Sequence, residues 1–317
     1  VNVYSARKEA LIKPLLDEFS ATTGIKVNLI TGKADALLKR LQVEGSATPA
    51  DVFITVDVGR LHRAKKAGVL KPVSLPELEK RIPPALRDTA GYWYGLTLRA
   101  RPIMYAKDRV TLDELSTYEA LAETQWEGRI CLRSSQSVYN QSLVAATIDA
   151  LGAEATQAWM QGMVNNLAKA PAGGDTDQLK AVAAGVCDVT LANTYYLARL
   201  INSSKSADQT TASKLGVFWP NQQGAGGRGA HFNVSGAGLT KYGKHPEQAR
   251  ALLEYLASDP AQAWYADINN EYPVVEGVTI SPTLEGFGAY KMDPIALEIL
   301  GQNNRQAVQL MDRAGWR

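Results

Sequence analysis

The chain has 317 residues, with 34 Lys or Arg, 32 Asp or Glu, and 45% apolar side chains. This length favours two domains or one large bilobal unit, and a formal charge of +2 gives no basis for predicting nucleic-acid binding. No apolar run approaches the roughly 18 to 20 residues of a membrane span, so we expect a water-soluble protein.

Short strands alternate with helices at the start of the chain. Apolar residues recur at helical spacing in residues 8–22 and 34–44, which predicts two amphipathic helices. Strands are predicted at residues 2–4, 25–30 and 51–55, the last being an apolar run suited to a buried parallel strand. This alternation is typical of βαβ units on a mostly parallel sheet.

A second α/β set follows an extended aromatic segment at residues 92–105, which we interpret as a crossing strand. The pattern then predicts strands at residues 128–132, 186–191 and 233–239, and helices at 141–151, 155–163, 177–184 and 246–257. The glycine-rich stretch at residues 221–229 follows no βα turn, so it indicates a hinge loop and not a phosphate-binding loop.

These elements predict two α/β lobes joined by crossing strands near residues 99–105 and 218–232. One lobe would contain residues 1–100 plus 233–275, because the strand after residue 233 resumes the alternating pattern. The other would contain residues 101–232 plus 276–317.

The two cysteines and the first residues bear on the cellular compartment. Cys131 and Cys187 fit either two buried thiols or one disulfide, depending on whether the compartment is oxidising. The chain begins at Val1 with a predicted strand and no Met, so we expect either a processed mature protein or a trimmed form, with any leader already removed.

Two loops that lead from a strand to a helix carry tyrosines. Tyr139 follows the strand at 128–132, and Tyr195 and Tyr196 follow the strand at 186–191. Loops at the carboxyl ends of strands converge on the ligand crevice of open α/β sheets, so the three phenols are expected to meet in one cleft. The alternative is ordinary aromatic packing of helix against sheet.

Three convergent phenols narrow the choice of ligand. Neutral phenols would bind a sugar or a peptide by stacking and hydrogen bonding. Phenolates are hard anionic donors, and the hard cation that suits them is ferric iron. No Cys or His cluster suits zinc, copper or ferrous iron, because His62, His231 and His245 are scattered.

Six segments of the chain are distinctive: residues 3–7, 50–57, 99–101, 137–142, 192–199 and 270–274, of which those with Tyr139 and Tyr195-Tyr196 are the specific ones. In these segments the chain resembles the periplasmic ferric-iron-binding proteins, the solute receptors of iron ABC importers. The resemblance implies an α/β, two-lobed periplasmic-binding-protein fold of type II, with mixed sheets flanked by helices and two hinge strands. It also implies that Tyr139, Tyr195 and Tyr196 are ligands of Fe3+.

The loop after the first strand departs from some members of that family. It reads Ser5 to Glu9 with no His or Tyr, and Val56 stands where one branch has Glu. The sequence leaves open whether Lys8, Glu9 or Asp57 contributes to the site.

Three phenolates leave about three positions of an octahedral ion open, and carbonate or a similar synergistic anion would fill two of them. We expect Arg7 and Arg101 to hold this anion bidentately, with weaker hydrogen bonds from Ser137 and Gln136. For both arginines the alternatives are surface solvation or an ion pair between the lobes.

The resemblance further implies a periplasmic receptor that delivers ferric iron to the permease and ATPase of an ABC importer, as a monomer. An oxidising periplasm and neighbouring strands would then join Cys131 to Cys187 in a disulfide. A receptor for another solute (an oxyanion, thiamine or a polyamine) is the alternative. An enzyme is not expected, because no Ser-His-Asp set, Cys-His pair or close acid pair stands at a strand end.

Overall fold

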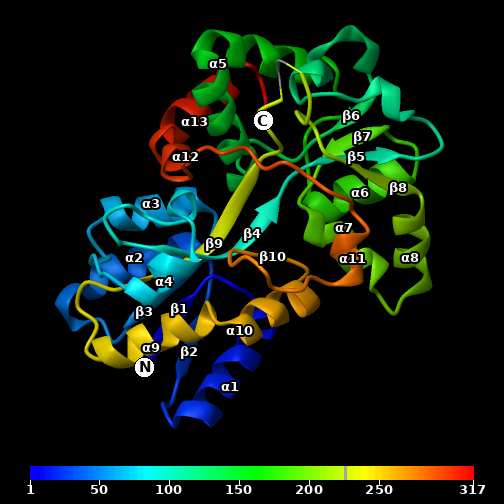
Figure 1. Cartoon of the computed structure of the whole chain (residues 1–317). Helices are drawn as coiled ribbons and strands as arrows, with labels where there is room; N and C mark the ends of the chain where they lie inside the picture. The colour runs from blue at the N-terminus through cyan, green and yellow to red at the C-terminus, as the bar shows by residue number, and fades with distance from the viewer. Residues whose placement is uncertain (225–226) are drawn as a thin grey trace. The chain divides into compact units, whose positions relative to one another are not determined.

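The computed structural model describes residues 1–224 and 227–317 and divides into two compact units (Figure 1). The first unit comprises Val1–Leu98, Asn233–Ile280 and Ala296–Gln302, and the second comprises Arg99–Phe232, Ser281–Ile295 and Asn303–Arg317. Each is an α/β unit with a sheet flanked by helices, as the sequence predicted.

The first unit is built on a six-stranded mixed sheet with strand order β10-β4-β9-β3-β1-β2. Strand β1 (Asn2–Ser5) pairs in parallel with β2 (Asn28–Thr31) and β3 (Val52–Val56). Strand β3 pairs antiparallel with β9 (Phe232–Leu239), and β4 (Tyr94–Ala100) pairs antiparallel with β10 (Tyr272–Pro273). The parallel pairs carry the βαβ units that the alternation predicted.

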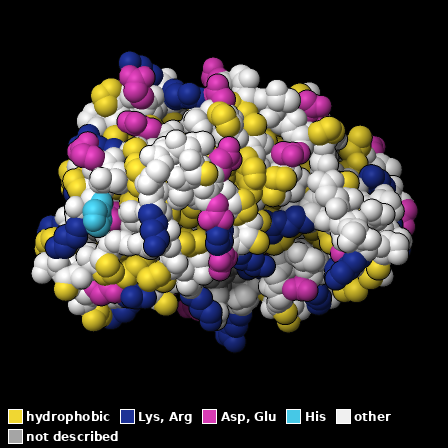
Figure 2. Space-filling model, turned by 90° about the horizontal axis from the view of Figure 1, so that it is seen from below, with side chains coloured by type: hydrophobic (Ala, Val, Ile, Leu, Met, Phe, Trp, Pro, Cys, Tyr) yellow, Lys and Arg dark blue, Asp and Glu magenta, His cyan; other side chains and the backbone are white. Residues whose placement is uncertain are grey.

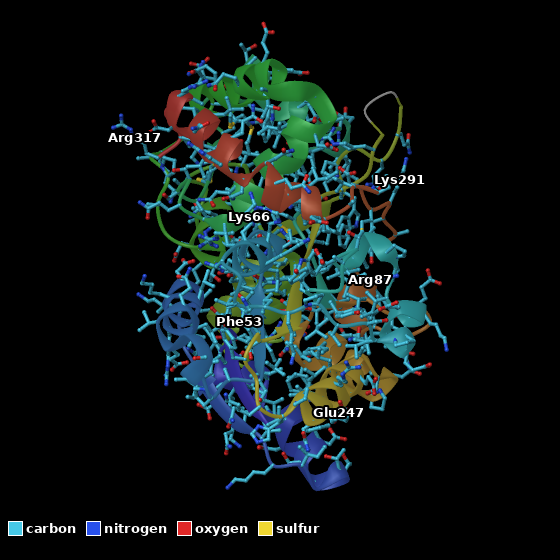
Figure 3. The ribbon with its side chains drawn as sticks, turned by 90° about the vertical axis from the view of Figure 1, so that its left-hand side faces the viewer. Phe53, Lys66, Arg87, Glu247, Lys291 and Arg317 are labelled. Carbon is cyan, nitrogen blue, oxygen red and sulfur yellow. A yellow bond between two sulfur atoms is a disulfide. The ribbon has the colours of Figure 1, made fainter. Side chains whose placement is uncertain are left out.

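Helices of this unit pack against the sheet and against one another. They are α1 (Lys13–Thr23), α2 (Ala34–Glu44), α3 (Val58–Lys66), α4 (Pro76–Arg81), α9 (Pro246–Leu256), α10 (Asp259–Trp264) and α12 (Glu298–Gln302). Short 3-10 helices lie at Glu9–Leu11, Gly45–Ala47 and Pro84–Leu86, and a π-helical turn lies at Tyr265–Asn269. Phe53 on β3, labelled in Figure 3, packs in one buried cluster with Leu37 and Leu41 of α2. Burying each such side chain contributes about 1.5–3 kcal/mol.

The second unit is built on a four-stranded sheet with order β6-β7-β5-β8. Strand β5 (Ile103–Ala106) pairs antiparallel with β7 (Val189–Leu191) and with β8 (Leu215–Phe218), whereas β6 (Ile130–Cys131) pairs in parallel with β7. The carboxyl ends of β6 and β7 therefore lie at the same edge of the sheet.

Helices of the second unit are α5 (Val138–Asn165), α6 (Asp175–Ala183), α7 (Thr194–Ile201), α8 (Ser206–Ser213), α11 (Pro282–Glu285) and α13 (Asn304–Arg313). Short 3-10 helices lie at Leu112–Glu114, Glu119–Ala122 and Thr124–Trp126. Gly152, with φ 80° and ψ 167°, interrupts α5. The interruption accounts for the two separate helices that the sequence predicted over this stretch.

The boundaries of the units differ from the predicted lobes at three segments. Arg99 and Ala100 belong to the second unit, although the sequence assigned them to the first lobe. Residues 276–280 and 296–302 belong to the first unit, although the sequence assigned them to the second lobe. Helix α12 packs against α3, where Glu298 pairs with Lys65 at 2.7 Å and Gly301 approaches His62 too closely to admit a Cβ atom. The pattern of α12 alone did not show which lobe it covers.

The predicted hinge loop at residues 221–229 is also placed differently. Residues 225 and 226 lie outside the described residues, and the stretch belongs to the second unit, with the unit boundary at Phe232. Asn221 is fully buried and donates a hydrogen bond to Glu119 at 2.8 Å.

The predicted disulfide is confirmed. Cys131 and Cys187 are bonded, with their Cα atoms 5.8 Å apart and a separation of 56 positions in sequence. The bridge joins Cys131, on β6, to Cys187, which lies just before the start of β7. Strands β6 and β7 are the two elements that lead to the tyrosine loops.

In the described part of the chain, no helix combines the length and apolar character that crossing a bilayer requires. Figure 2 shows basic and acidic side chains interspersed over the face in view. This mixing agrees with the near-neutral balance of charged residues in the sequence.

Candidate metal centre

The two tyrosine-bearing helices begin at the same edge of the second unit's sheet. The loop after β6 leads into α5, where Tyr139 is the second helical residue, and the loop after β7 leads into α7, where Tyr195 and Tyr196 are second and third. Because β6 and β7 are parallel neighbours, both first turns stand side by side. The expected meeting of the tyrosines follows from this pairing.

Arg99, on β4, lies between the tyrosines. Its guanidinium carbon is 5.0 Å from the ring centroid of Tyr139 and 4.6 Å from that of Tyr195. The rings of Tyr195 and Tyr196 are 4.4 Å apart. The three phenols predicted as ligands are therefore gathered around one buried cation.

The hydroxyl of Tyr195 is held by two donors. Arg99 Nη2 donates to Tyr195 Oη at 2.7 Å, and Asn193 Nδ2 donates to the same oxygen at 3.1 Å. A cationic donor makes the stronger hydrogen bond, and it favours the ionised form of a phenol.

The surroundings shift the pKa values of the three phenols in different directions. Burial alone would raise the pKa of Tyr139, but the charge of Arg99 and hydrogen bonds from Tyr195 and Arg99 outweigh burial and lower it below 10.0. Burial raises the pKa of Tyr195 well above 10.0, against the opposing charge of Arg99, and burial and the charge of Tyr139 raise the pKa of Tyr196. Tyr139 is thus the first of the three to become a phenolate.

Further arginines surround the phenols. Arg133 lies 5.3 Å and Arg101 5.9 Å from the ring centroid of Tyr139, and Arg199 lies 4.9 Å from that of Tyr195. Asp175 is the carboxylate that pairs with Arg101 and Arg133. The site therefore has an excess of positive charge that favours phenolates and anions.

The anion-binding role expected of Arg101 needs correction. Its Nη1 donates to Asp175 and Asn193, both at 2.9 Å, and its Nη2 donates to Asn140 at 2.7 Å and to the carbonyl of Leu191 at 2.9 Å. These four bonds use all four N–H groups of Nη1 and Nη2, and the side chain is 1% exposed. Arg101 has no pair of donors left for a bidentate anion.

Arg7 also has a carboxylate partner. Its Nη1 and Nη2 each donate at 3.0 Å to one oxygen of Glu271, which belongs to the same unit. The ion pair between lobes, weighed above as an alternative for Arg7, is instead an ion pair within one unit. An anion role for Arg7 stays a prediction.

The remaining candidates differ in what occupies their polar atoms. Among the described residues, the buried hydroxyl of Ser137 has no hydrogen-bond partner, and Gln136 is exposed on the same loop. Asp57 caps α3 through Gly59 N at 2.9 Å and accepts from Asn233 at 2.9 Å, whereas Lys8 and Glu9 are exposed.

Sequence reasoning missed Arg99, Arg133, Arg199, Asn193 and Asp175 as parts of this centre. One signal was present: Arg99 and Arg101 are two residues apart, and residues at that spacing share one face of a strand. The direction of that face depends on the position of β4 in its sheet, which periodicity does not give.

The described residues contain no group of three or more His, Cys, Asp or Glu side chains that could hold a metal ion.

Known proteins share both the sequence and this architecture. The family model described as bacterial extracellular solute-binding protein matches residues 4–263. Iron uptake protein A1 of Synechocystis sp. is 48% identical over 317 residues, which cover 100% of this chain and 87% of that protein. The Fe(3+)-binding periplasmic protein of Serratia marcescens is 30% identical over 318 residues, covering 99% and 89%.

A solved structure of a Trichodesmium protein, described as IdiA or FutA in complex with iron and citrate, superimposes with a TM-score of 0.96. Its sequence is 49% identical, and the match covers 100% of this chain and 99% of that one.

Proposed function

Because the chain belongs to the bacterial extracellular solute-binding proteins, we propose that it is a receptor for ferric iron, held by the phenolate oxygens of Tyr139, Tyr195 and Tyr196. The observation that carries the proposal is the gathering of these phenols around Arg99. Relatives named for iron uptake and Fe(3+) binding support the choice of ion.

Charge explains why this donor set selects a trivalent ion. Three phenolates together neutralise Fe3+, and hard anionic oxygens suit a hard cation. Binding must release the protons that Tyr195 and Tyr196 retain in the metal-free protein, so affinity falls as the pH falls.

A small anion completes the proposal. About three positions of an octahedral ferric ion remain after three phenolates, and carbonate, or citrate as named in the Trichodesmium complex, supplies oxygen ligands for them. The unpartnered Ser137 hydroxyl and the neighbouring Gln136 are the donors we assign to this anion, and Arg7 is a further candidate. The excess of arginines around the phenols favours its approach.

We assign the receptor to the periplasm, where it delivers iron to the permease and ATPase of an ABC importer. The family and the periplasmic relative of Serratia support this location, and the disulfide agrees with an oxidising compartment. In this role the protein binds and releases its cargo and catalyses no reaction.

Titration of the metal-free protein with ferric ion tests the proposal. We expect a visible phenolate-to-iron charge-transfer band, and loss of one anionic ligand in Tyr195→Phe should weaken ferric binding by orders of magnitude. Tyr105→Phe, a half-buried hydroxyl on β5 of the same unit, is the matched control and should leave the band unchanged. An unaltered band and affinity in Tyr195→Phe would show that the ligand set is wrong.

A further inference from the structure

Arg101 and Asp175 form a deeply buried ion pair beside the proposed ferric site. Their side chains are 1% and 0% exposed, and Arg101 Nη1 lies 2.9 Å from Asp175 Oδ2. Withdrawing each charge from water costs several kcal/mol unless further hydrogen bonds compensate. The partners of the other Arg101 N–H groups show how this cost is offset.

The donors of Arg101 reach both tyrosine-bearing loops. Asn193, which accepts from Nη1, is the residue before α7 and lies two positions from Tyr195. Asn140, which accepts from Nη2, follows Tyr139 in the first turn of α5. One planar guanidinium therefore connects the two loops whose tyrosines must meet.

Arg101 also fixes which way the two amides face. A guanidinium only donates, so each Asn presents its oxygen to Arg101 and turns its NH2 group away. Asn193 Nδ2 then donates to Tyr195 Oη at 3.1 Å. Asn140 Nδ2 donates to the carbonyls of Arg133 and Ser134, at 3.1 and 3.2 Å, and so holds the loop that precedes Tyr139.

Asp175 ties a third element to the same cluster. It is the first residue of α6, and its Oδ2 also accepts from the backbone N–H of Asn193 at 3.0 Å. Its Oδ1 accepts from Arg133 Nη1 at 3.1 Å, and Arg133 lies over the ring of Tyr139.

We infer that Arg101 and Asp175 are positioning residues, which through Asn140 and Asn193 set the spacing and orientation of Tyr139 and Tyr195 for ferric binding. The inference rests on the proposed function, since the phenols are positioned for a ferric ion. It assigns to Arg101 an indirect role, because its donors bind the protein.

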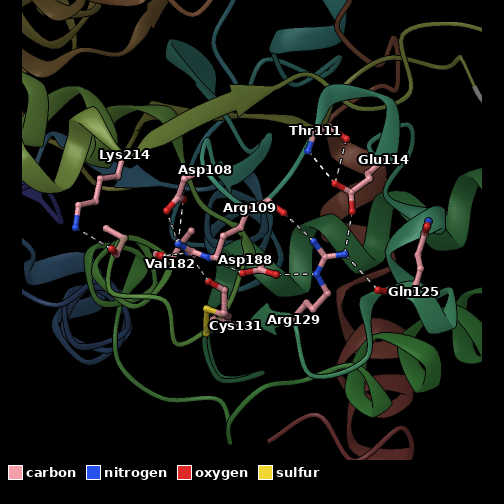
Figure 4. A network of polar contacts seen from close by, with 12 residues as sticks. Asp108, Arg109, Thr111, Glu114, Gln125, Arg129, Cys131, Val182, Asp188 and Lys214 are labelled. Atoms are coloured by element: carbon pink, nitrogen blue, oxygen red, sulfur yellow. Dashed lines mark hydrogen bonds and ion pairs between the residues drawn. A yellow bond between two sulfur atoms is a disulfide. The ribbon is translucent and has the colours of Figure 1, made fainter.

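The same unit offers a matched control. Asp188 also accepts from two arginines, from Arg109 Nε at 2.8 Å and Arg129 Nε at 2.7 Å (Figure 4). It stands just before β7, at the opposite end of that strand from Asn193 and Tyr195. Asp188→Asn therefore weakens a comparable carboxylate–arginine network away from the tyrosines.

The test compares Asp175→Asn, Arg101→Lys and Asp188→Asn by ferric affinity in citrate competition, by the wavelength of the charge-transfer band, and by the melting temperature of the metal-free protein. Arg101→Lys keeps the charge, but one ammonium cannot reach four acceptors on two loops. We expect Asp175→Asn and Arg101→Lys to lose about 10- to 100-fold in affinity and to shift the band. Asp188→Asn should lower the melting temperature while the affinity and the band stay as in the wild type.

Two results would overturn the inference. One is wild-type affinity and band position in Arg101→Lys, the variant that decides the matter if Asp175→Asn fails to fold. The other is the same relation between lost affinity and lowered melting temperature in Asp175→Asn and in Asp188→Asn, because affinity would then depend only on overall stability.

Failure of the proposed function would look different, because the wild type itself would then show no band. In that case the crystal structure of metal-free Arg101→Lys decides: displaced Asn193 and Tyr195 side chains support positioning, and unmoved ones refute it.

Discussion

Tyr139 differs from Tyr195 and Tyr196 in the direction in which its surroundings shift the pKa of the phenol. Buried phenols ordinarily keep their proton, as the raised pKa values of Tyr195 and Tyr196 show. At Tyr139 the cation of Arg99 and the hydrogen bonds it receives reverse the effect of burial. Tyr139 therefore loses its proton at lower pH than Tyr195 and Tyr196 do.

The first prediction is that one tyrosine of the metal-free protein ionises below the usual pKa of about 10. Absorbance at the tyrosinate band during a pH titration should show this early step, and Tyr139→Phe should abolish it. Arg99→Gln should move it to higher pH, because the charge that lowers the pKa is removed.

The sign of the linked stability follows from the same shift. Since the folded-state pKa lies below the unfolded one, ionisation of Tyr139 favours the folded state as the pH rises above the folded-state pKa, and this contribution is lost as the pH falls through it. Tyr290→Phe is the control, because burial raises the pKa of Tyr290 and its removal leaves the early step intact. An early step that persists in Tyr139→Phe would assign it to another tyrosine.

At the scale of single elements, helix α9 is anchored by a buried carboxylate. Asp51 accepts from the backbone N–H of Asn2 at 2.8 Å and of His245 at 2.9 Å, and it contacts His245 Nδ1 at 3.0 Å. Burial would raise the pKa of Asp51, but these hydrogen bonds and the His245 charge lower it. The ionised carboxylate thereby joins the start of α9 to β1.

The second prediction is that Asp51→Asn lowers the free energy of unfolding by about 1–3 kcal/mol at pH 7, because an amide satisfies these donors less well. The folded-state pKa is depressed, so this stability is present above the unfolded pKa of about 4 and is lost as the pH falls through the folded value. Urea denaturation at pH 7 and in acid should show the two proteins converging in acid. Asp17→Asn, which removes an exposed pair with Lys13, should change little at either pH.

Gly152 gives the third prediction. Its φ of 80° and ψ of 167° are accessible essentially to glycine alone, and no atom of the described residues lies within 4 Å of where a Cβ would be. Gly152→Ala should therefore cost about 1–3 kcal/mol through backbone strain, without a steric clash. Gly174→Ala, at φ −103° with the nearest atom 3.7 Å away, should be close to neutral in the same urea titration. Equal stabilities of the two variants would contradict the backbone explanation.

Sequence periodicity predicted the elements that carry the tyrosines better than it predicted what surrounds them. The placement of Tyr139 and Tyr195 after a strand and at the start of a helix depends on residues close by in sequence, so apolar runs and turn residues predicted it. The sequence predicted an anion-binding role for Arg101 because it shows the charge of this residue but not its hydrogen-bond partners. Those partners, Asp175 and the two asparagines, become neighbours only through the pairing of β5, β6 and β7.

For the whole molecule, the assignment of segments to units depended on contacts far apart in sequence. The return of the chain to the first unit at Asn233 was predicted because β9 resumes a regular pattern. The placement of α12 in the first unit was missed, since it depends on the fit of Gly301 against His62 and on the Lys65–Glu298 ion pair. After α12 the chain enters the second unit, and its last residue, Arg317, points outward in Figure 3.

The last prediction concerns the cross-link of the second unit. The Cys131–Cys187 bridge closes a segment of 56 residues, for which loop-closure entropy gives about 4 kcal/mol of stabilisation. Cys131→Ala with Cys187→Ala should lower the free energy of unfolding by about that amount in urea, with both sulfurs replaced by small apolar groups at these buried positions. Each single variant also loses the bridge but keeps one sulfur's packing, so the single and double variants should agree if the cross-link dominates. Losses that add from the two single variants to the double would instead assign the effect to packing of the sulfurs. The unmodified protein should show no alkylatable thiol when it is denatured without reductant, because both cysteines are in the bridge.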